Sequence, residues 1–192
     1  MTVQSPMPNH WAASKAAPGL FTAEECQRII ALRDSLAQET GTTSTFGSDK
    51  VYRESQISWI RLNDETRWIF KKTSQIMGRV NQSTYQMDLS GFGEPLQLAS
   101  YRVGHHYDWH IDTGGEESRA GARKLSFIVQ LSNETDYEGG EVQVRYGPDP
   151  MSLQKARGTI IVFPAYVLHR VRPILRGERI SLVGWMAGPP FR

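Results

Sequence analysis

The first part of the chain contains two stretches in which apolar residues recur at helical spacing. In the earlier one, which begins LFTAEECQ, Thr22 can cap a helix and Glu25 can return the hydrogen bond, as in a capping box. Phe21 and Cys26 are placed to pack together as a hydrophobic staple across the same turn. The apolar positions that follow the cap are Cys26, Ile29, Ile30 and Leu36. The pattern predicts an amphipathic helix with one buried face.

The second helical stretch, ETRWIFKKTSQIMGRVN, follows a short predicted strand, ESQISWIRL. Asp64 directly precedes the helical stretch and is its expected N-cap. Its apolar face consists of Trp68, Ile69, Ile76 and Val80. The polar run ETGTTSTFGSDK, which precedes the strand, has no period and predicts a loop. A loop of this length is either a substrate lid or plain surface, and both interpretations stay open for residues 40–50.

From Leu96 onward the pattern changes to short β-branched and aromatic runs separated by Gly, Pro, Asn or Asp. The runs are LQLASYRV, YDWHID, KLSFIVQLS, GGEVQVRY, GTIIVFP, LHRVRPI and RISLVGWM. Such evenly spaced short strands without helices between them predict an antiparallel sandwich or jelly roll. The expected fold class is α+β but mainly β, a double-stranded β-helix over about residues 96–187 with the N-terminal helices packed on one face.

The length of the chain fits one domain. Single cores commonly reach about 200 residues before a chain splits, and this sequence has 192. No internal repeat, long charge block or low-complexity segment indicates a second unit. We expect a loosely structured lead-in over residues 1–19 and a single domain over residues 20–192. The sequence gives no indication of the oligomeric state.

Composition narrows the function classes. The 22 Lys and Arg against 20 Asp and Glu give a net charge of +2, which provides no reason to expect a nucleic-acid partner. The single cysteine, Cys26, excludes an intramolecular disulfide and a multi-cysteine zinc site, and its helical spacing makes it a core residue. The first twenty residues lack the apolar run of a signal peptide, and nowhere do eighteen apolar residues stand together. These features predict a soluble cytoplasmic protein without a membrane partner.

The stretch HHYDWHID, from His105 to Asp112, concentrates three of the five histidines. Such a cluster is a metal site, a general acid and base site, or accidental crowding. Side chains two apart on a strand point to the same face, so His110 and Asp112 can bind one ion together. Two histidines and one carboxylate hold a divalent iron and leave positions open, and His169 is the candidate third ligand. The pattern H-x-D alone occurs by chance in many sequences, so the metal-site hypothesis needs support from other residues.

A second pair of polar residues supports the metal hypothesis. Arg179 and Ser181, in the segment RISLVGW, also lie two apart on a predicted strand and share a face. A guanidinium binds a carboxylate through two parallel hydrogen bonds, and a neighbouring hydroxyl can donate a third. A dicarboxylic 2-oxo acid fits this pair at one end and can chelate iron at the other.

These residues resemble a known family. The segments YRVGHHYDWHID, GGEVQV and GTIIVFPAYVLHRVRPILRGERISLVGW are similar, in order and spacing, to the iron(II)- and 2-oxoglutarate-dependent oxygenases of the prolyl 4-hydroxylase type. The resemblance covers about residues 20–187 and is specific mainly from Leu96 onward. It implies Fe(II), 2-oxoglutarate and dioxygen as cofactor and co-substrates. It also implies an oxidoreductase that hydroxylates an unactivated C–H bond and releases succinate and CO2.

The same resemblance implies roles for individual residues. The metal ligands of the family match His110, Asp112 and His169. Its basic co-substrate residue, ten positions after the distal histidine, matches Arg179, and its co-substrate tyrosine, nine positions before the first ligand, matches Tyr101. Ser181 resembles the serine of an R-x-S pair in several branches, and it is a further candidate for the co-substrate carboxylate.

One departure from the family pattern limits what can be said of the substrate. Animal and plant prolyl 4-hydroxylases carry lysine where this chain has Arg179, which is more similar to the bacterial PKHD-type hydroxylases. The substrate is therefore either a prolyl residue of a protein or peptide, or a free amino acid or small metabolite. Two other classes stay open: a cupin-like metal-binding protein without oxygenase activity, and a non-enzymatic binding module of sandwich fold.

The residues around the predicted site are assigned by strand alternation. His106 shares the inward parity of His110 and is a candidate for the substrate pocket, whereas Trp109 and Ile111 point away and are expected in the core. Trp185 shares the face of Arg179 and Ser181 and is a candidate pocket wall. Arg123 follows a glycine-rich segment and is either near the site or on the surface. Residues 113–123, like residues 40–50, are candidate lids.

Overall fold

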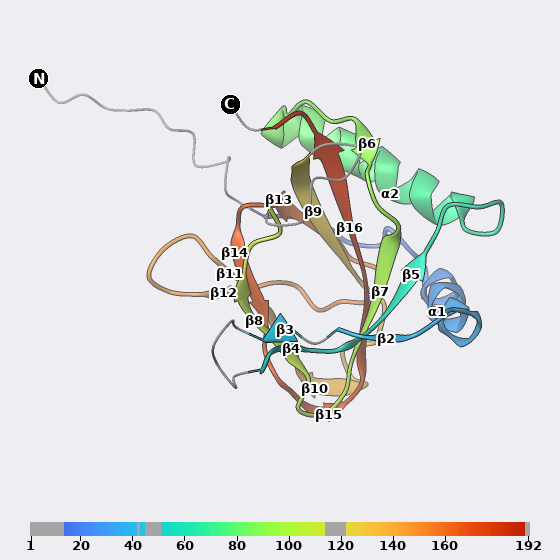
Figure 1. Cartoon of the computed structure of the whole chain (residues 1–192), viewed down its shortest axis with the longest axis vertical. Helices are drawn as coiled ribbons and strands as arrows, with labels where there is room; N and C mark the ends of the chain where they lie inside the picture. The colour runs from blue at the N-terminus through green and yellow to red at the C-terminus, as the bar shows by residue number, and fades with distance from the viewer. Residues whose placement is uncertain (1–13, 42, 45–50, 114–121, 191–192) are drawn as a thin grey trace, which may run out of the picture.

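The computed structural model describes residues 14–41, 43–44, 51–113 and 122–190. Within them the chain forms two facing β-sheets with helices on the outer face of one sheet (Figure 1). The paired strands of both sheets run antiparallel. The mainly β, double-stranded β-helix fold expected from the sequence is confirmed. None of the helices in these residues is long and apolar enough to cross a membrane.

The major sheet contains the longest strands. Its order is β1 (Lys15–Ala17), β13 (Ile160–Pro164), β9 (Ala122–Gln130), β16 (Arg179–Gly188), β7 (Leu96–Tyr101), β5 (Gln56–Ile60) and β2 (Glu39–Thr40), with β6 (Gly91–Phe92) beside β16. The minor sheet has the order β12 (Met151–Ser152), β11 (Val142–Arg145), β14 (Leu168–Val171), β8 (His106–His110), β4 (Val51–Glu54) and β3 (Thr43–Ser44). A separate two-stranded sheet of β10 (Tyr137–Gly139) and β15 (Ile174–Gly177) lies at one end of the sandwich (Figure 1).

Alternation along the strands divides the core into two apolar clusters. Leu125, Phe127 and Val129 of β9 belong to the cluster that joins the major sheet to the helices. Ile128 of the same strand belongs to the cluster between the two sheets. Successive side chains on a strand point to opposite faces, so one strand serves both layers. The polar side chains of the site occupy the inner face beside the second cluster.

The first helix begins where the sequence predicts. It comprises α1 (Ala23–Ala31), continued by the short 3-10 helix η1 (Leu32–Ser35). The amide of Thr22 donates to Glu25 Oε2 at 2.9 Å, and the amide of Glu25 donates to Thr22 Oγ1 at 3.3 Å. Both bonds of the predicted capping box are therefore present. Phe21 and Cys26 are both buried in the cluster beneath the helices.

The second helix begins differently from the prediction. It comprises α2 (Arg67–Val80), followed by a π-helical turn, η2 (Asn81–Tyr85). The prediction that Asp64 caps this helix is wrong. Its carboxylate lies in solvent and pairs with Arg67 at 2.8 Å. Asn63 and Thr66 instead exchange hydrogen bonds, each accepting at 3.0 Å from the backbone amide of the other. This reciprocal pair satisfies two backbone amides directly ahead of α2, and the amide of Arg67 donates to Asn63 O at 2.9 Å.

The predicted lead-in extends too far along the chain. Residues 1–13 lie outside the described part, but Lys15–Ala17 form β1, which pairs with β13 at the edge of the major sheet. Backbone pairing of so short an edge strand leaves no side-chain pattern in the sequence, because an edge strand needs no buried alternation. The candidate lids also lie largely outside the described part, which omits residues 45–50 and 114–121.

Candidate active site

His110, Asp112 and His169 come together between the two sheets. His110 and His169 are direct register partners on β8 and β14 of the minor sheet. Asp112 stands two residues beyond His110, where its amide donates to Ala165 O at 2.8 Å. Nε2 of His110 lies 3.7 Å from Asp112 Oδ1, and Nε2 of His169 lies 3.6 Å from Asp112 Oδ2. The three ligand atoms all lie within 4.8 Å of one another.

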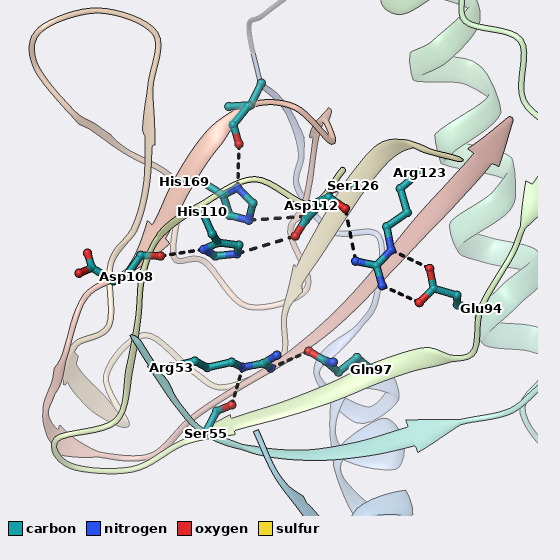
Figure 2. Close-up of polar contacts among 11 residues, drawn as sticks. Arg53, Ser55, Glu94, Gln97, Asp108, His110, Asp112, Arg123, Ser126 and His169 are labelled. Carbon is teal, nitrogen blue, oxygen red and sulfur yellow. Dashed lines mark hydrogen bonds and ion pairs between the residues drawn. The ribbon is translucent and has the colours of Figure 1, made fainter. Parts of the chain in front are cut away.

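Both imidazoles are oriented in the same way (Figure 2). Nδ1 of His110 lies 2.7 Å from Asp108 O, and Nδ1 of His169 lies 2.9 Å from Val167 O. Because a carbonyl only accepts, each Nδ1 carries the proton and each Nε2 is left with a lone pair. Burial, followed by the neighbouring His169, lowers the pKa of His110 to about 3. Neutral imidazole is the form that binds metal ions.

The carboxylate of Asp112 is held in its ionised form. Burial would raise its pKa, but His169, His110 and a 2.6 Å hydrogen bond from Ser126 Oγ together lower it. Ser126 lies on β9 of the major sheet, so this bond joins the two sheets at the cluster. Two neutral imidazoles and one carboxylate form the donor set that binds divalent iron in non-haem oxygenases. The residues therefore fit an Fe(II) ion.

A cavity of about 270 Å3 opens beside the three residues. It extends along the inner face of β16, past Trp185 and Ser181 to Arg179. Larger hollows of about 410 and 740 Å3 lie elsewhere on the surface, but neither is lined by the histidines or by Asp112. Of these three hollows, the smaller cavity is the one that brings the candidate metal ligands and a buried arginine together.

Arg179 is buried in this cavity without an acidic partner. Its side chain is among the largest that are fully buried, with 1% of its surface exposed. It donates to Gln130 Oε1 at 2.8 Å and to Ser181 Oγ at 3.3 Å, which are both neutral acceptors. Within the described residues its Nε has no hydrogen-bond partner, and the acceptors of its other nitrogens include no carboxylate. A buried guanidinium is costly unless an anion compensates its charge, so this position fits a carboxylate ligand.

The other predicted co-substrate residue lies directly beside Arg179. Tyr101 on β7 is its register partner on β16, and the guanidinium carbon lies 5.7 Å from the centre of the tyrosine ring. Tyr101, Arg179 and Ser181 all line the cavity. Adjacent antiparallel strands thus bring together two residues that are far apart in the sequence.

His106 lies outside the lining of the cavity, contrary to the alternation argument. Its ring nitrogens lie 3.2 Å from the carbonyl oxygens of Gly104 and Val51. The cause is a β-bulge in β8. His110 pairs with His169 but Tyr107 pairs with Val171, so an interval of three residues on β8 lies opposite an interval of two residues on β14. The extra residue turns Tyr107 toward the cavity instead, where its ring stacks on His110 at 3.4 Å between centroids.

Arg123 and Trp185 form one wall of the cavity. The guanidinium of Arg123 lies 3.8 Å above the indole ring. It also forms a two-pronged ion pair with Glu94, at 2.6 and 2.5 Å (Figure 2). It also donates to Asp112 O at 3.4 Å. Arg123 is thus part of the site and not a solvated surface residue. Trp185 Nε1 is buried without a hydrogen-bond partner in the described residues.

The two residues expected in the core near His110 differ from each other. Ile111 is wrong as a core residue, because 47% of its surface is exposed where the chain leaves β8. Trp109 is half-buried and lies under Arg170, whose guanidinium carbon is 4.5 Å from the ring centre. A strand that ends at the site cannot bury both side chains that point away from it.

Several residues of the site were missed by the sequence analysis. Ser126 and Gln130 lie four apart on β9, and polar residues at even spacing inside the apolar run KLSFIVQ are a signal that could have found them. Tyr107 needed knowledge of the bulge in β8. Arg53 and Gln97 lie on β4 and β7, and only the pairing of distant strands brings them into the cavity.

Comparison with known proteins agrees with this geometry. Residues 96–187 match the model of the 2OG-Fe(II) oxygenase superfamily. A PKHD-type hydroxylase of Sphingopyxis alaskensis is 35% identical over 162 residues, which are 81% of this chain and 71% of that protein. A PKHD-type hydroxylase of a Synechococcus strain is 39% identical over 92 residues, which are 47% of this chain and 40% of that protein. This chain thus spans less than half the length of the latter.

Solved structures share the fold at low sequence identity. A prolyl-4-hydroxylase of Pseudomonas putida superposes with a TM-score of 0.73 at 21% identity, covering 93% of this chain and 94% of that one. A prolyl hydroxylase of Trichoplax adhaerens, in complex with a hypoxia inducible factor peptide fragment, superposes with a TM-score of 0.73 at 16% identity. That match covers 91% of this chain and 83% of the other. At this identity the likeness concerns the fold alone.

Proposed function

The chain belongs to the PKHD-type hydroxylases of the 2OG-Fe(II) oxygenase superfamily, and from that membership we propose that it hydroxylates an unactivated C–H bond at the expense of 2-oxoglutarate. One observation carries the proposal. A cluster of two histidines and a carboxylate shares a cavity with a fully buried arginine that pairs with no carboxylate among the described residues. A dicarboxylate that chelates a metal ion at one end needs a cation at the other, and the cavity offers both partners.

His110, Asp112 and His169 would hold Fe(II) through Nε2, a carboxylate oxygen and Nε2. Ser126 would keep the carboxylate in place, and the carbonyls of Asp108 and Val167 would keep the imidazoles in one tautomer. When bound, iron and 2-oxoglutarate supply the oxidation, in which dioxygen is consumed and succinate, CO2 and a hydroxylated product are released.

Arg179 would bind the far carboxylate of 2-oxoglutarate. Its guanidinium is already oriented by Gln130 and Ser181, so little side-chain entropy is lost when the anion arrives. Tyr101 and Ser181 offer hydroxyl groups at the same end of the cavity. Together they would fix the distance of the co-substrate from the three metal ligands.

Apolar side chains would exclude water from the reacting centre. Ile128, Val171 and Val183 line the cavity between the metal ligands and the far arginine. Excluding water strengthens the electrostatic interactions inside the site and limits side reactions, so an apolar wall protects the reaction. The protein's part is coordination, orientation and exclusion of water.

The substrate is a prolyl residue of a protein or peptide, or alternatively a free amino acid or small metabolite. Prolyl hydroxylation is supported by two structures of similar fold, which are both prolyl hydroxylases and share only the fold with this chain. The second candidate is supported by the positive charge of Arg53 in the cavity wall. Both use the same metal centre.

The proposal is tested by incubating the protein aerobically with Fe(II), 2-oxoglutarate and panels of peptides and metabolites. Mass spectrometry should find one substrate that gains one oxygen atom while succinate accumulates in equal amount. Iron binding without succinate under any aerobic condition would instead indicate a cupin-like metal-binding protein.

A further inference from the structure

The third arginine of the cavity, Arg53, has no role in the proposed metal and co-substrate site. Arg53 lies on β4, where its Nε donates to Ser55 Oγ and its Nη2 donates to Gln97 Oε1, both at 2.9 Å (Figure 2). Its guanidinium carbon lies 4.7 Å from the ring centre of Tyr107. Three contacts therefore fix the orientation of this side chain at the cavity wall.

Among the described residues, no acidic side chain compensates the charge of Arg53. Its acceptors are a hydroxyl and an amide, and no carboxylate of the described residues pairs with it. Arg123 in the same cavity shows the contrast, because Glu94 neutralises it with two hydrogen bonds. A half-buried guanidinium with neutral partners keeps donors and charge available for a ligand.

The position of Arg53 separates it from the co-substrate end. Its partner Gln97 is the register partner of Val183, whereas Tyr101 is the register partner of Arg179, four residues earlier on β16. At about 3.3 Å per residue these levels lie about 13 Å apart along the sheet. Arg53 instead approaches the metal ligands through Tyr107, whose ring stacks on His110. A group bound at Arg53 would therefore lie beside the metal centre and not beside Arg179.

Counting charges over the described residues leaves Arg53 as the excess cation of the loaded site. Arg123 and Glu94 cancel each other, and both histidines are neutral ligands. The positive charges of Fe(II) and Arg179 are balanced by the negative charges of Asp112 and of 2-oxoglutarate, which is a dianion. The remaining positive charge is that of Arg53, and an enclosed site favours a ligand that neutralises it.

We propose that Arg53 binds a carboxylate of the substrate and so places the neighbouring C–H bond at the metal centre. The proposal rests on the proposed function and narrows its substrate class to molecules that carry a free carboxylate close to the hydroxylated carbon. Free amino acids and their N-acylated derivatives meet this requirement. An internal prolyl residue of a peptide does not, since its carboxyl group is an amide.

The backbone around Arg53 supports a preformed binding site. The amide of Gly41 donates to Ser55 O at 2.8 Å, and a Cβ added at Gly41 would lie 2.7 Å from Ser55 Oγ and 3.1 Å from Arg53 Nε. The chain thus passes against the two side chains with no room for a methyl group. Close packing of this kind restricts the guanidinium to one orientation before any ligand binds.

The test uses protein loaded with Zn(II), which is redox-inert, and N-oxalylglycine, an unreactive analogue of 2-oxoglutarate. Ligand-observed NMR measures the affinity of L-amino acids and N-acetylamino acids, each paired with its carboxamide. We expect at least one acid to bind tenfold or more tightly than its amide. This preference should disappear in Arg53→Gln and be partly retained in Arg53→Lys, which keeps the charge.

Arg170→Gln is the matched control. Arg170 also donates to a glutamine, Gln143, at 2.9 Å and also covers an aromatic ring, at 4.5 Å, but it does not line the cavity. Its substitution should leave the preference unchanged. The proposal is overturned if no acid is preferred over its amide, or if the preference survives in Arg53→Gln.

Binding of N-oxalylglycine is measured separately in every variant. Loss of this binding together with the acid preference in Arg53→Gln would show that Arg53 serves the co-substrate or the fold, which also overturns the proposal. Wild-type protein that binds neither Zn(II) nor N-oxalylglycine would contradict the proposed function itself. The two failures are thus distinguishable.

Discussion

His110 and His169 face each other as register partners across β8 and β14, with ring centroids 4.1 Å apart. Antiparallel pairing of two strands therefore sets the separation of two metal ligands that lie far apart in the sequence. Asp112 completes the set from the segment that leaves β8, held by Ser126 on the opposite sheet. The metal centre thus depends on both layers of the sandwich.

Ser126→Ala is expected to weaken metal binding without unfolding the protein. The change removes the 2.6 Å hydrogen bond to Asp112 Oδ2 and leaves the three ligands in place. Loss of a partner of this kind commonly lowers metal affinity by about tenfold to a hundredfold. Competition with a metal chelator measures the affinity, and Ser74→Ala on the exposed face of α2 is the control. Unchanged affinity would show that Ser126 does not support the ligand.

Arg179→Gln is expected to weaken 2-oxoglutarate binding strongly. Removing one partner of a buried charge pair costs about 2–5 kcal/mol, which corresponds to about thirtyfold or more in affinity. Calorimetry on metal-loaded protein measures the dissociation constant. Arg176→Gln, which removes an exposed arginine of the preceding strand in the sequence, β15, is the matched control. Equal affinities of the two variants would remove Arg179 from the site.

Tyr101→Phe is expected to have a smaller effect on the same dissociation constant. The substitution keeps the buried ring and removes only its hydroxyl, and a neutral hydrogen bond contributes about 0.5–1.5 kcal/mol. The affinity for 2-oxoglutarate should fall by about twofold to tenfold while thermal stability stays close to wild type. A wild-type dissociation constant would mean that Tyr101 is a packed aromatic of the strand.

Cys26 is expected to be unreactive in the native protein. Its side chain is fully buried beneath the helices, and burial raises the pKa of the thiol to about 11. The thiolate is the reactive form of a cysteine. With this pKa, only a small fraction of Cys26 is thiolate at pH 8, and the fraction grows as the pH approaches 11. Thiol-specific labelling at pH 8 should be slow until denaturant is added. Rapid labelling of the native protein would contradict the burial of α1.

Local features of the fold could be predicted from the sequence because their partners are close along the chain. The capping box at Thr22 needs only residues within one turn. The spacing of His110, Asp112, His169 and Arg179 was informative because a family keeps it. Asp64 was mispredicted as a cap because Asn63 and Thr66, in the same turn, compete for the same backbone amides.

Features that depend on pairing between distant strands could not be predicted in this way. The bulge in β8 exchanges which of His106 and Tyr107 faces the cavity, and no local sequence pattern predicts it. Arg53 enters the cavity because β4 pairs with β8 and because Gln97 of β7 approaches it from the opposite sheet. Single-sequence alternation assigns faces within a strand but not the partners across the sandwich.

Visible absorption of Fe(II)-loaded protein titrated with 2-oxoglutarate without oxygen tests the central claim most directly. The expected result is a charge-transfer band that saturates with 2-oxoglutarate, needs higher concentrations in Arg179→Gln and is lost in Asp112→Ala. Wild-type protein that binds Fe(II) but develops no band at saturating 2-oxoglutarate would contradict the assignment of this cavity as an oxygenase active site.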